Sequence, residues 1–307
     1  ENFNVTYDKW FSERSLHPAA ICEACEILKA NGNIYEEDGA LWLKSSAYGD
    51  DKDRVVIRDN GVPTYLAADI AYHKNKYERG FKKMINIWGA DHHGYVARVK
   101  AAMEALGFDA DKLEILLLQM VSLFRNGELV KMSKRTGRAI TLNELIEEVG
   151  TDAARYFFIM RSLDTQLDFD LDLATSHSNE NPVYYIQYAN ARIFSIYRQV
   201  AENGDTFDMT WKNVVWNKLQ EERELELIKK ISAYPEEIQT AAADRAPHRI
   251  ARFVYELAGL FHAFYNNCHI IQSDKELEEA RLALVTAVQI TIANSLAVLG
   301  ISAPEKM

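Results

Sequence analysis

Long helical patterns fill the second half of the chain, and they constrain its fold more than any other feature. After Gly150 the signals for strands almost disappear, and helical spacing covers residues 182–202, 211–232, 247–267 and 276–299. Within 247–267 the apolar residues form one stripe at three- and four-residue spacing: Ile250, Phe253, Val254, Leu257, Leu260, Phe261 and Phe264. Successive amphipathic helices pack together along such stripes. We predict a helix bundle over residues 176–307.

The segment 61–175 instead alternates short apolar strands with helices. Helical spacing covers 66–77 and 95–106, while 84–88 and 113–121 are apolar runs of strand length. Such runs are typical of strands buried on both faces of a parallel sheet, and the alternation is typical of βαβ units. The sequence therefore predicts an α/β fold followed by an all-α part. About half of a doubly wound, Rossmann-like sheet is visible.

Residues 1–60 give mixed signals. A helical pattern covers 18–29, and short strands at 41–43 and 55–57 are joined by a charged turn that contains Gly49 and Asp50. We predict that this part is inserted in, or connected to, the α/β domain. Because the chain does not begin with methionine, we also expect a fragment of a longer protein.

Composition indicates a cytoplasmic globular protein. Hydrophobic residues make up 48% and charged residues 26% of the chain, and we find neither a membrane span nor a signal peptide. Three cysteines are too few for a disulfide framework, and Cys22 and Cys25 fall inside a helical pattern, so we expect free thiols. The net charge of −10 argues against broad nucleic-acid binding but not against a local RNA site.

The first candidate site is a cationic loop that contains Lys131, Met132, Ser133 and Lys134. Four of the ten residues from 129 to 138 are Lys or Arg. An apolar strand precedes the loop, and a capping box at Thr141 opens a helix after it. Strand, cationic loop and helix together place a phosphate-binding loop at the carboxyl edge of a sheet. The alternative is a solvated basic turn.

The second candidate follows the strand 84–88 and contains Gly89, Asp91, His92 and His93. A glycine at a strand end lets a ligand approach the backbone, and the imidazoles and the carboxylate can bind ribose, phosphate or a metal. Asp-His-His also resembles the motif of a manganese phosphoesterase family, but the further aspartates that this family needs are missing. Histidines satisfied around a turn are a third interpretation.

The third candidate is the pair Tyr65 and Asp69. On a helix these residues lie four positions apart and share a face. A phenol and a carboxylate together suit a cationic ligand, and a carboxylate fits the fork of a guanidinium best. A packed tyrosine beside a surface aspartate is the structural alternative.

Taken together, these motifs resemble the arginine–tRNA ligases of bacterial type, a family of class I aminoacyl-tRNA synthetases. The resemblance covers essentially the whole chain. Its markers are 49–54, 65–71, 88–95, the Lys131-Met132-Ser133-Lys134 motif, 152–158, 181–185 and 303–307.

The resemblance implies ATP-dependent attachment of arginine to its tRNA through arginyl-adenylate. It implies that residues 1–60 belong to the catalytic domain as an inserted part, that 61–175 form its carboxyl-terminal half, and that 176–307 bind the anticodon. It assigns site residues as follows: catalysis to Lys131 and Lys134; ATP binding to Gly89, Asp91, His92, His93, Met132 and Ser133; arginine binding to Tyr65, Asp69 and His92; tRNA binding to Arg135, Arg155, Tyr188 and Arg192.

The partners implied are arginine, ATP with Mg²⁺, and the tRNA for arginine; we expect a monomer without a protein-bound metal. One departure is clear, because the family's first nucleotide motif, His-x-Gly-His, is absent. We therefore expect these residues to be inactive alone. The alternatives left open are another class I synthetase, a metal-dependent phosphoesterase of the Asp-His-His type, and a non-catalytic tRNA-binding helical module.

Overall fold

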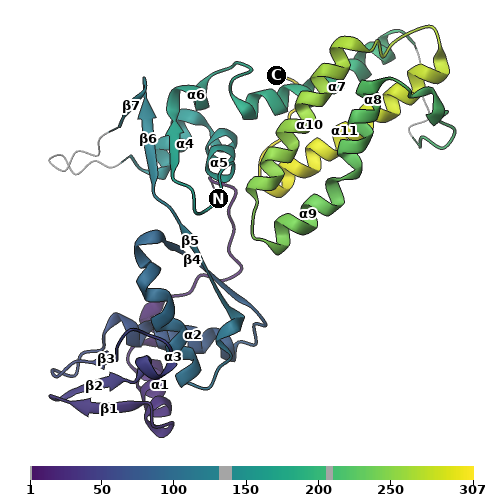
Figure 1. The fold of residues 1–307 in the computed structure, drawn as a ribbon. Coiled ribbons are helices and arrows are strands. Elements are labelled where there is room, and N and C mark those ends of the chain that lie inside the picture. Colours follow the sequence, from purple (N-terminus) through teal and green to yellow (C-terminus); the bar gives the residue numbers. More distant parts are fainter. Residues whose placement is uncertain (1, 131–139, 205–209) are drawn as a thin grey trace. The chain divides into compact units, whose positions relative to one another are not determined.

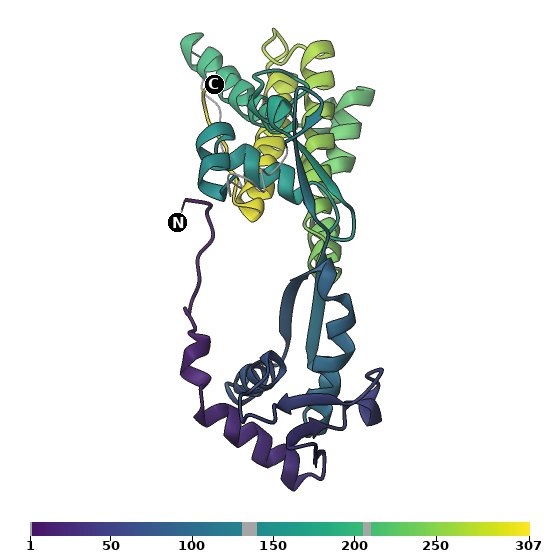
Figure 2. The same cartoon turned by 90° about the vertical axis from the view of Figure 1, so that its left-hand side faces the viewer.

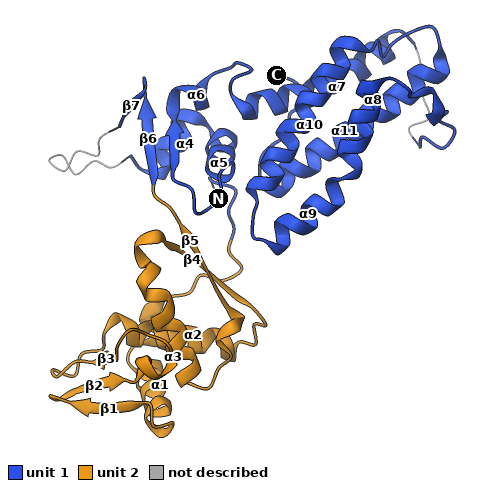
Figure 3. Cartoon of the chain, viewed as in Figure 1, with its two compact units in different colours: residues 1–6, 121–307 blue, residues 7–120 orange. Residues whose placement is uncertain are grey.

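Residues 2–130, 140–204 and 210–307 are described by a computed structural model (Figures 1 and 2). The chain divides into two compact units (Figure 3). Unit 2 comprises residues 7–120, and unit 1 comprises residues 1–6 and 121–307. The functional division at 60/61 and 175/176 stays a prediction.

Unit 2 combines two small sheets with three helices. An antiparallel sheet has the order β1-β2-β3, and β4 pairs with β5 in parallel. The bounds are α1 Ala19–Ala30, β1 Ile34–Glu37, β2 Ala40–Leu43, β3 Arg54–Ile57, α2 Tyr65–Glu78, β4 Met84–Gly89, α3 Val96–Ala105 and β5 Leu113–Leu118. Short 3-10 helices occupy η1 Glu13–Leu16, η2 Ser45–Tyr48, η3 Ala90–Tyr95 and η4 Ala110–Lys112. The thiols of Cys22 and Cys25 are free on α1, as predicted.

The parallel pair departs from the sequence prediction in two ways. Figure 1 shows β4 and β5 side by side. Their pairing register sets Met84 opposite Leu113. Met84 and Leu113 are buried against the helices of unit 2, whereas Ile87 on the other face is 64% exposed. The prediction that β4 is buried on both faces is therefore wrong for the residues that the structure describes. An apolar run records side-chain chemistry and not whether both faces are covered.

The predicted strand 113–121 is also two strands. β5 ends at Leu118, and β6 Val121–Arg125 begins a different sheet in unit 1. There β6 pairs with β7 Glu128–Leu129 in antiparallel and with β8 Leu167–Asp170 in parallel. The sequence shows almost no strand signals after Gly150, because alternating Asp residues hide the apolar face of β8, where Phe169 is fully buried.

The other regular elements that the structure describes in unit 1 are helices. Their bounds are α4 Leu142–Val149, α5 Thr151–Ile159, α6 Leu171–Thr175, α7 Pro182–Glu202, η5 Trp216–Lys218, α8 Glu222–Ser232, α9 Tyr234–Ala243, α10 His248–Asn267 and α11 Lys275–Leu299. The capping box at α4 is confirmed, with Thr141 Oγ1 accepting from the Glu144 amide at 3.2 Å. The predicted helix 211–232 begins only at Glu222, because Glu221 supplies a second capping box there.

The bundle core is formed by α7, α8, α10 and α11. The stripe predicted on α10 is confirmed, since Phe253, Leu257 and Phe261 are buried in one apolar core. α11 is long and apolar enough to span a membrane by length and composition, with a mean hydropathy of 1.9 over its most apolar window. Since 61% of that window is buried inside the protein, α11 fits the role of a core helix.

Residues 2–4 lie against α5 and the end of α11 within unit 1. The Arg155 guanidinium donates from Nη1 to the Phe3 carbonyl at 2.7 Å and from Nε to the Leu299 carbonyl at 2.8 Å. Gly300 ends α11 with a φ of +69°, and a Cβ there would lie 2.6 Å from Arg155 Nη2. The position therefore requires glycine both for its backbone and for its space.

Candidate functional site

The carboxylate of Asp69 lies half-buried on α2. Its Oδ2 accepts a hydrogen bond from the Tyr95 hydroxyl at 2.7 Å. Burial raises the pKa of Asp69, and the bond from Tyr95 together with electrostatic interactions with Lys76 and His92 opposes that rise. The Asp69 side chain is therefore held by a specific partner, which excludes a freely solvated surface aspartate.

Tyr65 lies one turn before Asp69 on α2, as the four-residue spacing predicts. Its side chain is 85% exposed, so a packed core tyrosine is also excluded. A single exposed aromatic ring is common on a protein surface, so this exposure leaves Tyr65 accessible to a ligand but does not by itself indicate one. No contact between Tyr65 and Asp69 appears within the described part of unit 2.

A buried polar network braces the same turn of α2. His73 is 2% exposed, and its Nδ1 donates to the main-chain carbonyl of Asp69 at 2.8 Å. Nε2 must then accept from the Asn86 amide, which lies 2.6 Å away, and Asn86 Oδ1 accepts from Lys76 Nζ at 2.8 Å. Burial lowers the pKa of His73 to about 4, so the ring is neutral at neutral pH. This network joins α2 to β4.

The Gly89-to-His93 segment forms the strand end and the 3-10 turn η3. A Cβ on Gly89 would lie 2.5 Å from Oδ1 of Asp91, but Gly89 has an ordinary φ of −64°, and the Asp91 side chain is exposed and can move aside, so the turn itself does not require glycine. The side chains of Asp91 and His92 are 79% and 60% exposed, and Asp91 Oδ2 lies 3.8 Å from His92 Nε2. The histidines are thus not satisfied inside the fold. Across residues 2–130, 140–204 and 210–307, no group of three His, Cys, Asp or Glu side chains could hold a metal.

Lys131, Met132, Ser133, Lys134 and Arg135 lie outside the described residues. Their assignments remain those of the sequence. Arg155, predicted to bind tRNA, uses Nη1 and Nε on main-chain carbonyls. A contact between Arg155 and tRNA stays a prediction, and it would have to use Nη2, the remaining guanidinium nitrogen.

Tyr188 and Arg192, also predicted to bind tRNA, are brought together on α7. The Arg192 guanidinium carbon lies 4.6 Å from the Tyr188 ring centre and 4.5 Å from that of Tyr265 on α10. The Tyr184 ring stacks on the Tyr188 ring with 6.1 Å between ring centres, and the His262 ring stacks on the Tyr188 ring with 5.9 Å between ring centres. The sequence prediction missed Tyr184, although the i, i+4 spacing of 184, 188 and 192 could have shown it. His262 and Tyr265 come from another helix, which spacing could not show.

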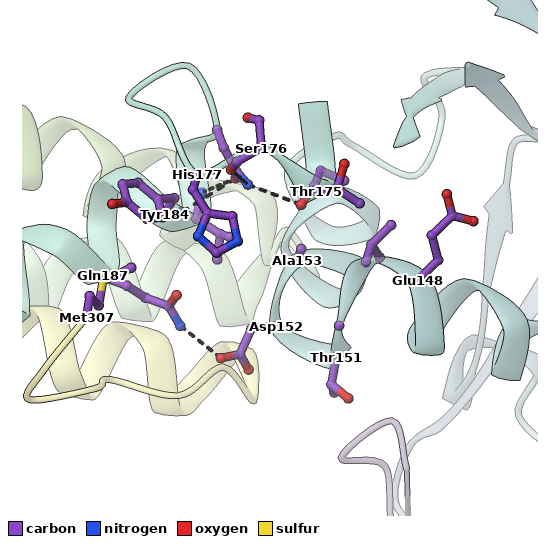
Figure 4. A pocket seen from close by; sticks show the side chains of 15 residues that line it. Glu148, Thr151, Asp152, Ala153, Thr175, Ser176, His177, Tyr184, Gln187 and Met307 are labelled. Carbon is purple, nitrogen blue, oxygen red and sulfur yellow. Dashed lines mark hydrogen bonds between the residues drawn. The ribbon is translucent and has the colours of Figure 1, made fainter. Parts of the chain in front are cut away.

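A cavity of about 680 Å³ opens beside this stack within unit 1 (Figure 4). Asp152 at the start of α5 accepts from Gln187 Nε2 at 2.8 Å, as the dashed line in Figure 4 shows. Glu148 and Asp152 make the lining acidic, which disfavours a phosphate. His177, whose ring lies 5.7 Å from that of Tyr184, also lines the cavity.

Comparison with known proteins identifies the family. Residues 1–162 match the family model described as tRNA synthetases class I (R), catalytic domain, and residues 186–307 match the DALR anticodon binding domain. The chain belongs to the class I (R) tRNA synthetase family. Curated arginine–tRNA ligases of Desulforudis audaxviator and Carboxydothermus hydrogenoformans are each 57% identical over 100% of this chain and 55% of their own length. The chain thus spans about half the length of these relatives.

Solved structures agree with the class I (R) assignment. A putative arginyl-tRNA synthetase from Campylobacter jejuni superposes with a TM-score of 0.91 at 41% identity, covering 100% of this chain and 66% of that one. The Thermus thermophilus arginyl-tRNA synthetase, at 24% identity and a TM-score of 0.81 over 61% of its chain, shares the fold. The predicted fold class and family are confirmed. The matches support neither a metal-dependent phosphoesterase nor a non-catalytic helical module.

Proposed function

We propose that the natural polypeptide containing this chain is an arginine–tRNA ligase. The observation that carries the proposal is the 57% identity to curated arginine–tRNA ligases over the whole chain. Arginine's carboxylate attacks the α-phosphorus of ATP, and pyrophosphate leaves. A hydroxyl of the terminal ribose of the tRNA then attacks the carbonyl carbon of the adenylate, forming the arginyl ester and releasing AMP. The protein's part is positioning and charge stabilisation.

In unit 2, Asp69 with Tyr65 and His92 holds the arginine guanidinium. The support is a half-buried carboxylate fixed by Tyr95 beside an exposed phenol on one helix face. Gly89, Asp91, His92 and His93, with Met132 and Ser133, take the ATP. Lys131 and Lys134 stabilise the triphosphate, and Mg²⁺ arrives bound to the ATP phosphates. Mg²⁺ usually binds through one or two carboxylates together with the phosphates of the substrate.

In unit 1, Tyr188 and Arg192 contact tRNA, with Arg135 and Arg155 as further positive charges. The support is the stack of rings and guanidinium on α7, because unpaired bases stack on aromatic and arginine planes. We further propose that the enzyme is a cytoplasmic monomer, and that 1–60, 61–175 and 176–307 are the inserted, catalytic and anticodon-binding parts.

The test is arginine-dependent exchange of pyrophosphate into ATP, measured with and without tRNA, on the natural polypeptide. Transfer of labelled arginine to tRNA is measured in parallel. Exchange that responds to arginine and to no other amino acid supports the proposal. Exchange driven by a different amino acid, or none under any condition, overturns it.

Asp69→Asn should lower the affinity for arginine at least tenfold and leave that for ATP unchanged. The variant keeps the side-chain volume but removes the charge, and its amide cannot accept both bonds of a guanidinium. Hydrogen bonds to charged groups contribute about 1.5–3 kcal/mol each. Arginine and ATP affinities are measured side by side. Asp38→Asn is the matched control, because this exposed residue of the same unit has a φ of 51°, which Asn also tolerates. Equal losses for both ligands would contradict the assignment.

A further inference from the structure

A chain of contacts leads from the charged turn after η2 to Asp69. Its first member is Asp50, whose side chain is 2% exposed. Asp50 accepts from Arg54 at 2.9 Å (Nε) and 3.0 Å (Nη2) and from the Asp51 amide at 2.9 Å. Burial raises the pKa of this carboxyl, but the bonds from Arg54 and Asp51 outweigh burial and hold the pKa well below its usual range. Asp50 is therefore a fixed, buried negative charge.

Arg98 on α3 is the second member. Its Nε lies 3.7 Å from Asp50 Oδ2, and its guanidinium carbon lies 4.9 Å from the centre of the Tyr95 ring. The guanidinium is thus placed between a buried carboxylate and an aromatic face. The contact with Asp50 is an ion pair without a hydrogen bond, and together with the aromatic contact it holds the guanidinium against the Tyr95 ring and restrains that ring.

Tyr95 is the third member, at the end of η3. Its ring also meets Trp88 edge-on at 5.8 Å, and its hydroxyl donates to Asp69 Oδ2. Burial and the bond to Asp69 both raise the pKa of Tyr95, so the phenol stays protonated and remains a donor. Oδ1 of Asp69 makes no hydrogen bond to any residue of the described ranges, and Oδ2 keeps a second lone pair, so both carboxylate oxygens can still accept from a ligand.

We propose that Tyr95 and Arg98 are positioning residues for arginine recognition: Arg98, anchored by Asp50, fixes the Tyr95 ring, and Tyr95 fixes the plane of the Asp69 carboxylate. The inference rests on the proposed role of Asp69 and extends it to residues outside the arginine site. A guanidinium is planar and pairs with a carboxylate in its own plane, so orientation of that plane is what recognition requires. A carboxylate ordered in advance also loses less freedom on binding.

Tyr95→Phe tests the hydroxyl by removing a single oxygen atom. The KM for arginine in pyrophosphate exchange should rise about tenfold, while the KM for ATP stays within about twofold. The acidic limb of kcat/KM for arginine should move to higher pH, because loss of a donor raises the pKa of Asp69 while Lys76 and His92 still face it. Tyr77→Phe is the control, since that hydroxyl donates to the Asp109 carbonyl at 2.8 Å in the same unit.

Arg98 variants test the rest of the chain of contacts. Arg98→Met keeps the apolar stem and should raise the KM for arginine as Tyr95→Phe does, whereas Arg98→Lys keeps a cation near the ring and should restore part of the affinity. If Arg98 acts through Tyr95, the double variant Tyr95→Phe/Arg98→Met should be little worse than either single variant. If the losses of arginine affinity in the two single variants multiply in the double variant, Arg98 does not act through Tyr95, and this part of the proposal is overturned. If Arg98→Met does not fold, Tyr95→Phe alone decides the proposal.

Asp69→Asn separates the two levels of inference. Unchanged arginine affinity in Asp69→Asn would overturn the proposed arginine site itself. A tenfold loss in Asp69→Asn beside unchanged affinity in Tyr95→Phe and Arg98→Met would overturn the positioning role alone. Equal loss of arginine and ATP binding in Tyr95→Phe would also overturn it, because a general structural defect does not select one ligand.

Discussion

Arg281→Met should destabilise the helix bundle by about 3–5 kcal/mol. Arg281 on α11 pairs with Glu224 on α8 at 2.6 Å, and the two side chains are only 8% and 0% exposed. Arg281 Nη1 also donates to the His269 carbonyl at 2.7 Å. Removing the guanidinium leaves a carboxylate buried without its counter-charge, which costs far more than the pair itself contributes.

The double variant Glu224→Gln/Arg281→Met should recover most of this loss. Glutamine carries no charge, and its carbonyl oxygen can still accept from the Glu221 amide, as Glu224 does at 2.9 Å in the capping box of α8. Arg252→Met is the surface control and should hardly change stability, because Arg252 is 81% exposed in its pair with Glu256. Native-state hydrogen exchange of peptides from α8 and α11 measures each variant. A single variant as stable as the double variant would contradict the prediction.

Local patterns predicted much of this fold. The stripe on α10, the capping box at Thr141 and the parallel pair β4–β5 follow from spacing and residue type, which depend on near neighbours in sequence. Sequence patterns did not predict features that depend on contacts between residues far apart in the chain. Whether Ile87 is covered depends on what packs over β4, and the division of 113–121 depends on which strand each half pairs with.

The candidate site follows the same division. Spacing placed Tyr65 and Asp69 on one helix face, and the strand-end glycine marked the turn that carries His92. The partner of Asp69 could not be predicted, because Tyr95 is 26 residues away and meets it only because α2 packs on α3, the helix that follows Tyr95. Asp50 and Arg98 are further apart in sequence still. Contacts between residues so far apart in sequence can be identified only from the folded structure. The proposed orientation of the Asp69 carboxylate depends on them.

Lys134→Ala in the natural polypeptide should lower the rate of adenylate formation roughly a hundredfold and weaken arginine binding little. Lys134 belongs to the cationic loop, which lies outside the described residues, and the prediction rests on the loop's composition and the family. A charge that follows the triphosphate acts mainly in the transition state, so its loss falls on kcat rather than on the affinity for arginine. One such contact contributes on the order of a few kcal/mol.

Single-turnover formation of arginyl-adenylate measures the rate directly, beside equilibrium binding of arginine. Lys134→Arg keeps the charge but replaces a compact ammonium by a wide planar group, so it should recover only part of the rate. Lys82→Ala is the control, because this exposed lysine precedes β4, at the opposite end of the strand from Gly89. If Lys134→Ala and Lys82→Ala have equal, small effects, the loop is a solvated basic turn. A rate loss specific to Lys134 would mean that its charge acts on the phosphates as the bond to pyrophosphate breaks.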